Sequence, residues 1–321
     1  MPVYSMLMVA GAVLAAFSPA AGVAHAHSRG VTPDEIWLAW RWEPLPLLLA
    51  AAGLYVRGLR MMRRRARSGA VYRWRARAFA AGALALGIAF VSPLDAMGGT
   101  LLFAHMAQHL VLILMTAPAL ALSAPTAPLL WALSPPHRRG LVRWWQRTAM
   151  ARYSACVLRS PILAGALHGA MLWAWHLPRL YDGALHSDLL HLIEHISLLA
   201  TALIFWRAVV ASGVGRGVRA GAGILACFIL SLTGGLLGAL MTLARRPWYP
   251  VYSHHTTAWS LSALDDQQLA GLLMWGVGGM VYAAAALTLL GRWLTLADVA
   301  DSTAMRTGAP APPRPGIGIE G

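Results

Sequence analysis

Two pairs of histidines, each with a spacing of four residues, lie in apolar segments of the chain. His105 and His109 belong to LLFAHMAQHLVLILM, and His191 and His195 belong to LLHLIEHISLLATALIFW. In an α-helix, residues at i and i+4 lie one turn apart on the same face. Polar rings are costly in lipid and usually have a function there. The two pairs therefore indicate a shared site, most simply a metal or haem held between transmembrane helices.

Other polar side chains are expected at a similar depth and could complete such a site. His176 is the candidate for an additional ligand. Carboxylates can orient imidazoles by accepting hydrogen bonds from their N–H groups. Methionine with histidine is a ligand set that suits copper, particularly Cu(I). The candidates for orienting or gating roles are Asp95, Asp182, Glu194, Asp266, Met106 and Met274. The loop residues His186, His254 and His255 are candidates for transient metal capture, whereas His168 is expected to be a buried, hydrogen-bonded residue.

The composition is that of an integral membrane protein. The 321 residues are 58% hydrophobic and 12% charged, whereas a soluble domain carries about 25% charged residues. Only two cysteines are present, Cys156 and Cys227, without a C-x-x-C pair, so a metal site must use histidine, methionine and carboxylate. All 26 basic residues are arginines, and they lie in loops near the membrane. This placement favours a topology signal and contact with anionic lipid, and it argues against nucleic-acid binding.

The hydropathy pattern predicts an all-α, polytopic transmembrane helix bundle. Residues 1–26 are apolar and end in Ala24-His25-Ala26, the small-x-small pattern of a cleavage site. They are predicted to be a signal peptide or an additional N-terminal span. Residues 27–300 form the predicted seven-helix transmembrane domain, and residues 301–321 the predicted disordered cytoplasmic tail. The predicted spans are 42–59, 76–93, 101–122, 161–177, 189–210, 221–243 and 268–291.

The distribution of arginines predicts the orientation of the chain. Twenty-one arginines fall in alternate connections and the C-terminal tail, and five fall in the remaining connections. By the positive-inside rule, the mature N-terminus is outside and the C-terminus is in the cytoplasm of a bacterial inner membrane. Both histidine pairs then lie in the first turns of their spans, close to the outer surface.

Three functions fit these residues. The first is non-enzymatic: a copper carrier or metallocentre assembly factor, supplied by an exported donor and serving a membrane partner. The second is a zinc peptidase, because His191 to His195 match H-x-x-E-H, with Glu194 as the general base. The third is a haem or quinone electron carrier, because histidines on two helices can clamp a haem.

Several stretches resemble the CtaG-type cytochrome c oxidase assembly proteins of the Bacillus kind, a multi-span membrane family. They are SPLD at 92–95, HMAQHLVLILMTAPAL at 105–120, WHLPRLYDGALHSDLLHLIEHISLLATALIFW at 175–206 and LDDQQLAGLLMWGVGG at 264–279. The resemblance implies a polytopic helical fold and a role in maturing a haem–copper oxidase, at the copper centre next to its active-site haem. The expected partner is the oxidase subunit that carries this copper centre. The motif histidines of the family map onto His105, His109, His176, His191 and His195.

Together these observations predict an outward-opening pocket between the third, fourth and fifth spans. One copper would be held there by His105, His109, His191 and His195 in some combination, with His176 as the candidate for an additional ligand. The seventh span would close the pocket with Asp266, Gln267 and Met274.

Overall fold

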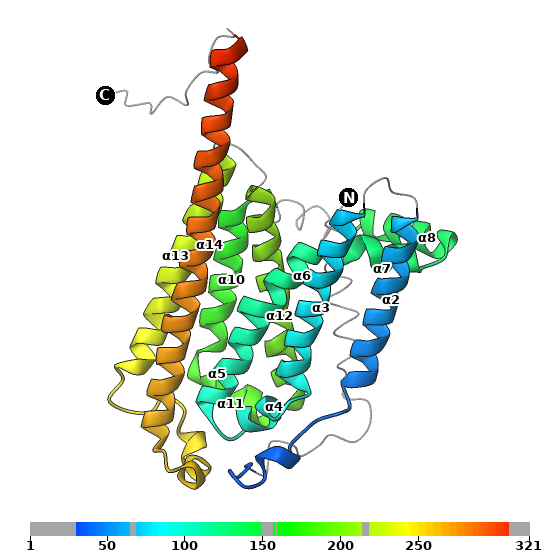
Figure 1. Ribbon diagram of the computed structural model, residues 1–321. Coiled ribbons are helices and arrows are strands. Elements are labelled where there is room, and N and C mark those ends of the chain that lie inside the picture. Colours follow the sequence, from blue (N-terminus) through cyan, green and yellow to red (C-terminus); the bar gives the residue numbers. More distant parts are fainter. Residues whose placement is uncertain (1–29, 65–68, 149–156, 158, 214–217, 308–321) are drawn as a thin grey trace, which may run out of the picture.

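The chain folds into one bundle of helices that run side by side (Figure 1). The computed structural model describes residues 30–64, 69–148, 157, 159–213 and 218–307. Within these ranges every regular element is helical, in agreement with the predicted all-α class. The predicted signal peptide or extra span, residues 1–26, lies outside the described residues.

Helices occupy all seven segments that the hydropathy pattern predicts. The long elements are α2 (Leu45–Arg63), α3 (Ala70–Phe90), the continuous α5 (Leu102–Leu110), η2 (Val111–Thr116) and α6 (Ala117–Ser123), then α10 (Pro161–Trp175), α12 (Asp188–Ser212), α13 (Val218–Thr242) and α14 (Ala263–Thr307). The short elements are η1 (Ile36–Leu38), α4 (Pro93–Gly98), α7 (Thr126–Ala132), α8 (Pro135–Gln146), α11 (Pro178–His186), η3 (Pro250–His254) and η4 (Thr256–Trp259). Helix α14 continues to Thr307, so the first residues of the predicted disordered tail, 301–321, are helical. Residues 308–321 of that tail lie outside the described residues.

Five of the described helical segments are long and apolar enough to cross a membrane. They are α2, the α5–η2–α6 stretch, α12, α13 and the Ala263–Leu296 part of α14. Helix α10 has 15 residues, fewer than the roughly 20 that cross a bilayer perpendicularly. Helix α3 carries three arginines in its first half, in the sequence AVYRWRARAF. A total of seven spans therefore stays a prediction.

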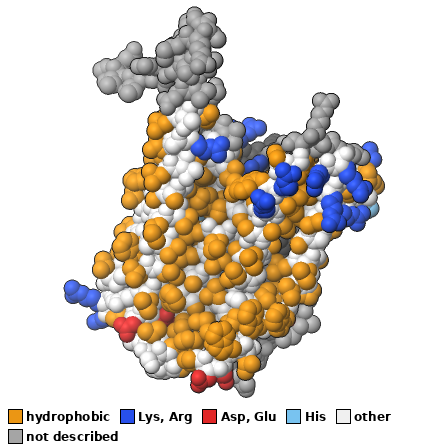
Figure 2. All heavy atoms as spheres, viewed as in Figure 1, with side chains coloured by type: hydrophobic (Ala, Val, Ile, Leu, Met, Phe, Trp, Pro, Cys, Tyr) orange, Lys and Arg blue, Asp and Glu red, His pale blue; other side chains and the backbone are white. Residues whose placement is uncertain are grey.

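The side of the bundle seen in Figure 2 is covered largely by apolar side chains. Leu84, Leu232 and Met280 are each more than half exposed, and they belong to three different long helices. Soluble monomers rarely expose apolar patches of more than a few hundred Å², so this surface suits lipid chains. Arginines gather at the end of the bundle that holds α7 and α8 in Figure 1.

The helix that carries His105 and His109 changes its winding directly after them. α5 passes into the π-helical segment η2 and then into α6. Pro118 has no backbone N–H, so a regular α-helical bond to the carbonyl four residues earlier is lost here. The indole N–H of Trp206 donates to the Ile113 carbonyl at 2.8 Å, which ties η2 to α12. π-helical turns often occur beside functional sites.

Helices α13 and α14 pack with their backbones in contact. A Cβ atom on Gly271 would lie 2.5 Å from the Gly238 carbonyl oxygen, and one on Gly238 would lie 2.7 Å from the Gly271 carbonyl oxygen. Small residues at helix crossings allow such a close approach in membrane proteins. This packing fixes α14, whose first turn contacts the start of α5.

Candidate metal centre

The two histidine pairs meet between α5 and α12. The ring centroids lie 5.3 Å apart for His105 and His191, 5.7 Å for His105 and His195, and 5.0 Å for His109 and His195. Side chains of His105, His109 and His195 are at most 4% exposed, whereas His191 is partly exposed. The four imidazoles therefore form one cluster, and His191 is its member nearest to the surface.

Glu194 joins the two pairs to each other. Its Oε1 atom lies 3.6 Å from Nε2 of His105 and 3.7 Å from Nε2 of His109. Both carboxylate oxygens of Glu194, Nε2 of His105 and both ring nitrogens of His109 are buried without a hydrogen-bond partner among the described residues. Buried polar atoms without partners are destabilising. Imidazole nitrogens and a carboxylate oxygen buried this close together are the arrangement expected of ligands that face a metal ion.

The ligand atoms form two overlapping sets. His105, His109 and His195 make one set, and His105, His191 and Glu194 make the other, with the ligand atoms of each set within 4.8 Å of one another. His105 belongs to both sets. Nitrogen and carboxylate oxygen in this arrangement suit a first-row transition metal such as copper or zinc.

Local sequence and tertiary contacts fix where both helices begin. The Ser187 hydroxyl accepts a hydrogen bond from the Leu190 backbone N–H and so caps the start of α12, one turn before His191. Helix α5 is capped by a residue of another helix, α14. The Asp266 carboxylate accepts hydrogen bonds from the backbone N–H groups of Leu102 (2.7 Å) and Phe103 (3.0 Å). A carboxylate also interacts favourably with the positive end of a helix dipole. Asp266, predicted as an orienting or gating residue, thus positions the helix that carries His105.

Three buried tyrosines border the cluster, and sequence reasoning did not single them out. The Tyr181 ring lies 5.3 Å from the His105 ring. The hydroxyls of Tyr181 and Tyr252 are 2.7 Å apart, and the Tyr252 hydroxyl donates to the Gly98 carbonyl. Burial raises the pKa of both phenols well above its usual range, so both stay neutral. Tyr249 donates to the His176 carbonyl at 2.7 Å. No spacing signal marks these residues, because they lie in two separate connections.

His176 lies beside this border rather than in either ligand set. Its Nδ1 atom is 2.7 Å from the Leu172 carbonyl, and its Nε2 atom is 3.3 Å from the sulfur of Met106. The carbonyl requires the N–H of the ring at Nδ1, and Nε2 then faces the Met106 thioether. Met106 and Met274 pack together with Tyr181, Tyr249 and Tyr252 in one buried group.

Asp95 takes part in a separate network that holds the other face of α5. Its carboxylate pairs with the Arg41 guanidinium at 2.5 Å and accepts from the Gln108 side-chain amide at 2.7 Å. The same amide nitrogen donates to the Ala89 carbonyl at 2.8 Å. Asp95 therefore reaches the histidines only indirectly, through Gln108. That role was not visible in the sequence, where Gln108 appeared only as part of HMAQH.

The remaining candidates lie farther from the cluster. The Gln267 side-chain oxygen accepts a hydrogen bond from the Trp248 backbone N–H at 2.6 Å, which ties the 243–262 connection to α14. The side-chain nitrogen of Gln267 donates to the Met241 carbonyl. His168 is fully buried and lies 3.0 Å from the Thr201 hydroxyl, as expected. Asp182 and His186 are both more than half exposed and contact each other. His254 is exposed and His255 partly so. None of these residues belongs to either ligand set.

A helix bundle with apolar sides and a buried histidine–carboxylate cluster near one end defines a class: helical membrane proteins with a candidate metal centre. Within that class, the chain belongs to the cytochrome c oxidase caa3 assembly factor family (Caa3_CtaG), whose family model matches residues 53–295. This confirms the family that the sequence motifs resemble.

Two mycobacterial proteins are similar to most of this chain. An uncharacterized protein of Mycobacterium bovis and one of Mycobacterium tuberculosis are each 25% identical to it over 279 residues. The similarity covers 82% of this chain, and the chain spans about 40% of the length of these curated relatives. No solved structure matches the chain.

Proposed function

We propose that this protein assists the assembly of a cytochrome c oxidase by binding copper in the cluster of His105, His109, His191, His195 and Glu194. The copper is cargo, destined for the copper centre of the oxidase. One observation carries the proposal. Buried nitrogen and oxygen atoms that could ligate a metal, and that have no hydrogen-bond partners, come together from two helices in a member of an oxidase assembly family.

The two overlapping ligand sets suit transfer better than permanent storage. A metal held by His105, His109 and His195 can exchange ligands for His191 and Glu194 while it remains bound to His105. Each exchange replaces one bond at a time, so the ion never loses all its ligands at once. His191 is partly exposed, and we expect copper to enter and leave on its side.

The proposed orientation places the cluster at the exported face of a bacterial inner membrane. The arginine-rich end of the bundle faces the cytoplasm by the positive-inside rule, and the cluster lies toward the other end (Figure 1). We expect an exported copper donor on this face, and the oxidase subunit that carries the copper centre as the partner.

The packing of the rings favours a metal ion over the alternatives. Across the two helices, the ring centroids of His105 and His195 are 5.7 Å apart, and those of His109 and His195 are 5.0 Å apart. Because every imidazole lies against another, no slot for a porphyrin separates the two pairs. A peptidase would need Glu194 to reach a water beside a substrate, but this residue is 0% exposed.

The membership of His105 in both ligand sets provides a test of the proposed copper site. We expect His105→Ala to abolish copper binding, because it breaks both ligand sets. His109→Ala and His191→Ala each leave one set of three intact, so both should bind one copper with lower affinity. Copper would be measured by elemental analysis and by competition with a chelator of known affinity.

A double variant of exposed histidines, His186→Ala/His254→Ala, is the matched control and should bind copper like the unaltered protein. Thermal unfolding in detergent would show that all variants fold. An unchanged copper content in His105→Ala would remove the assignment of this site.

A further inference from the structure

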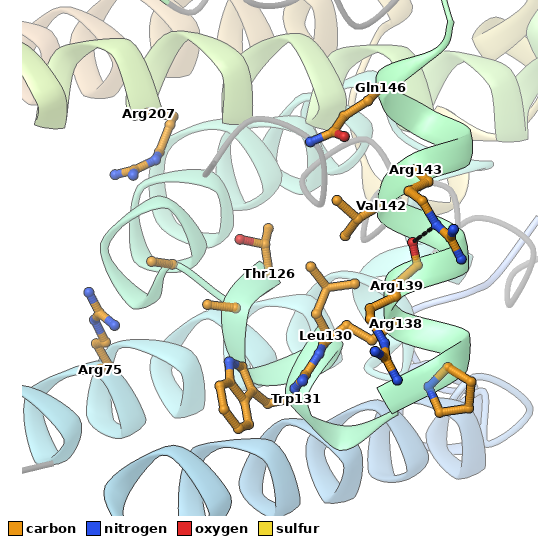
Figure 3. A pocket seen from close by; sticks show the side chains of 13 residues that line it. Arg75, Thr126, Leu130, Trp131, Arg138, Arg139, Val142, Arg143, Gln146 and Arg207 are labelled. Atoms are coloured by element: carbon orange, nitrogen blue, oxygen red, sulfur yellow. Dashed lines mark hydrogen bonds between the residues drawn. The ribbon is translucent and has the colours of Figure 1, made fainter. Parts of the chain in front are cut away.

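A large cavity lies at the end of the bundle away from the histidine cluster, where α7 and α8 pack near α3 and α12 (Figures 1 and 3). Its volume is about 900 Å³. The floor is largely apolar and includes Ala127, Leu130, Trp131 and Val142. A cavity of this size is comparable to sites that bind drug-sized ligands. The proposed copper chemistry makes no use of it.

Five arginines surround this apolar floor in two groups. Arg75 from α3 and Arg207 from α12 lie on one side, and Arg138, Arg139 and Arg143 from α8 lie on the other (Figure 3). Among the residues that the structure describes, no acidic side chain lines the cavity and no ion pair engages any of these arginines. The cavity is therefore strongly positive.

Burial makes these charges unusual. Arg75, Arg138 and Arg207 are only partly exposed. The Arg138 guanidinium lies 4.3 Å from the centroid of the Trp131 ring, which supplies a modest cation–π attraction. Partly desolvated cations without anions are destabilising, so an anionic ligand would stabilise this end of the protein.

The backbone around the cavity is held in a defined shape. Ala124, at the turn between α6 and α7, adopts the left-handed conformation with φ 45°. Strained backbone of this kind persists only where its surroundings hold it. The buried Tyr55 hydroxyl lies within hydrogen-bonding distance of the carbonyls of Arg75 (3.1 Å) and Ser123 (3.2 Å). Tyr55 thereby ties α2 to α3 and to the end of α6, beside the cavity.

We propose that this cavity binds an anionic phospholipid. Its phosphates would lie against the arginines, and its acyl chains against Leu130, Trp131 and Val142. A small anion such as free phosphate would gain nothing from the apolar floor, and a neutral lipid would leave the arginines unpaired. The two separate arginine groups suit a lipid with two phosphates, such as cardiolipin. Basic pockets between helices on the cytoplasmic side are known to bind such headgroups.

Binding can be measured on the full-length protein in a neutral detergent, with native mass spectrometry of added lipids. We expect cardiolipin and phosphatidylglycerol to bind at least about tenfold more tightly than phosphatidylcholine. Each arginine near an anionic lipid strengthens binding about fivefold. The Arg75→Gln/Arg207→Gln variant should therefore bind anionic lipid about 25-fold more weakly.

The matched control is Arg73→Gln/Arg77→Gln, which removes two exposed arginines from α3, the helix that carries Arg75, without altering the cavity. It should bind anionic lipid like the unaltered protein. Equal weakening in both variants would overturn the proposal, because binding would then reflect net charge alone. Full competition by millimolar inorganic phosphate would also overturn it, in favour of a phosphate site.

A second variant covers the case in which Arg75→Gln/Arg207→Gln fails to fold. Arg139→Gln/Arg143→Gln alters two exposed positions on α8, where folding should be unaffected. It should weaken anionic lipid binding to a similar degree, and unaltered binding would contradict the assignment of the second arginine group.

Discussion

Glu194 is the side chain on which the chemistry of the candidate centre depends most. Its carboxylate lies between His105 and His109 of the other helix, and it is fully buried. A buried carboxylate is stable only with compensating charge or hydrogen bonds. A bound cation would supply that compensation, and the carboxylate would in turn balance the charge of the metal or orient an imidazole.

Replacing Glu194 by glutamine should therefore lower copper affinity. The amide keeps the size of the side chain and one acceptor oxygen but removes the negative charge. By analogy with groups that support metal ligands elsewhere, we expect a loss of about 10- to 100-fold, measured by chelator competition. Asp182→Asn removes an exposed carboxylate and should leave the affinity unchanged. If Glu194→Gln bound copper as tightly as the unaltered protein, the carboxylate would have no part in the site.

At the scale of elements, α5 depends on α14 for its position. The carboxylate of Asp266 holds the first N–H groups of α5, and α14 is held in turn by its close crossing with α13. The glycines at that crossing are required because backbone, not flexible side chain, occupies the space where a Cβ would lie. The geometry of the metal centre thus rests on a contact between two helices that carry none of its ligands.

Gly271→Ala should destabilise the protein by about 1–3 kcal/mol, the usual effect of overpacking. The new Cβ would lie 2.5 Å from the Gly238 carbonyl oxygen and 2.7 Å from the Thr242 backbone nitrogen. Thermal unfolding in detergent at a fixed scan rate measures the effect. Gly276→Ala, on the same helix, would meet no atom within 4 Å and should be neutral or slightly stabilising, because alanine favours helix. Equal Tm values for the two variants would contradict the described crossing.

The whole molecule is polarised along the bundle. The candidate metal centre lies toward one end and the arginine-lined cavity lies at the other, with apolar sides between them (Figures 1 and 2). The two proposals can therefore be tested separately, because a variant at one end should leave the other unaffected. Copper affinity of the Arg75→Gln/Arg207→Gln variant should equal that of the unaltered protein.

In the cell, the proposed function predicts an oxidase with a defined defect. A strain without this protein should contain oxidase with its haem but with little copper at the centre next to it. Oxidase activity should be lost, while the reduced haem spectrum is retained. The His186→Ala/His254→Ala variant should restore the copper and His105→Ala should not. Fully metallated oxidase in the deletion strain would contradict a role in copper delivery.

Local features of the chain were sufficient for the helices and for the pairing of histidines within each helix. Hydropathy located the seven long helical segments of the described residues, because apolar length and a lack of charge depend on neighbouring residues alone. The i, i+4 spacing placed His105 with His109 and His191 with His195 on common faces for the same reason. The number of spans does not follow from hydropathy alone, since α3 carries arginines and α10 is short.

The partners of each side chain, in contrast, followed only from how the helices are rotated and packed against one another. Rotation of α12 against α5 turns Glu194 toward His105 and His109. His176, which belongs to the same family motif, faces Met106 instead, and Asp95 faces Arg41 and Gln108. The tyrosines beside the cluster come from connections with no periodic pattern. Helix rotation is set by contacts between residues far apart in the chain, and no spacing within one segment encodes it.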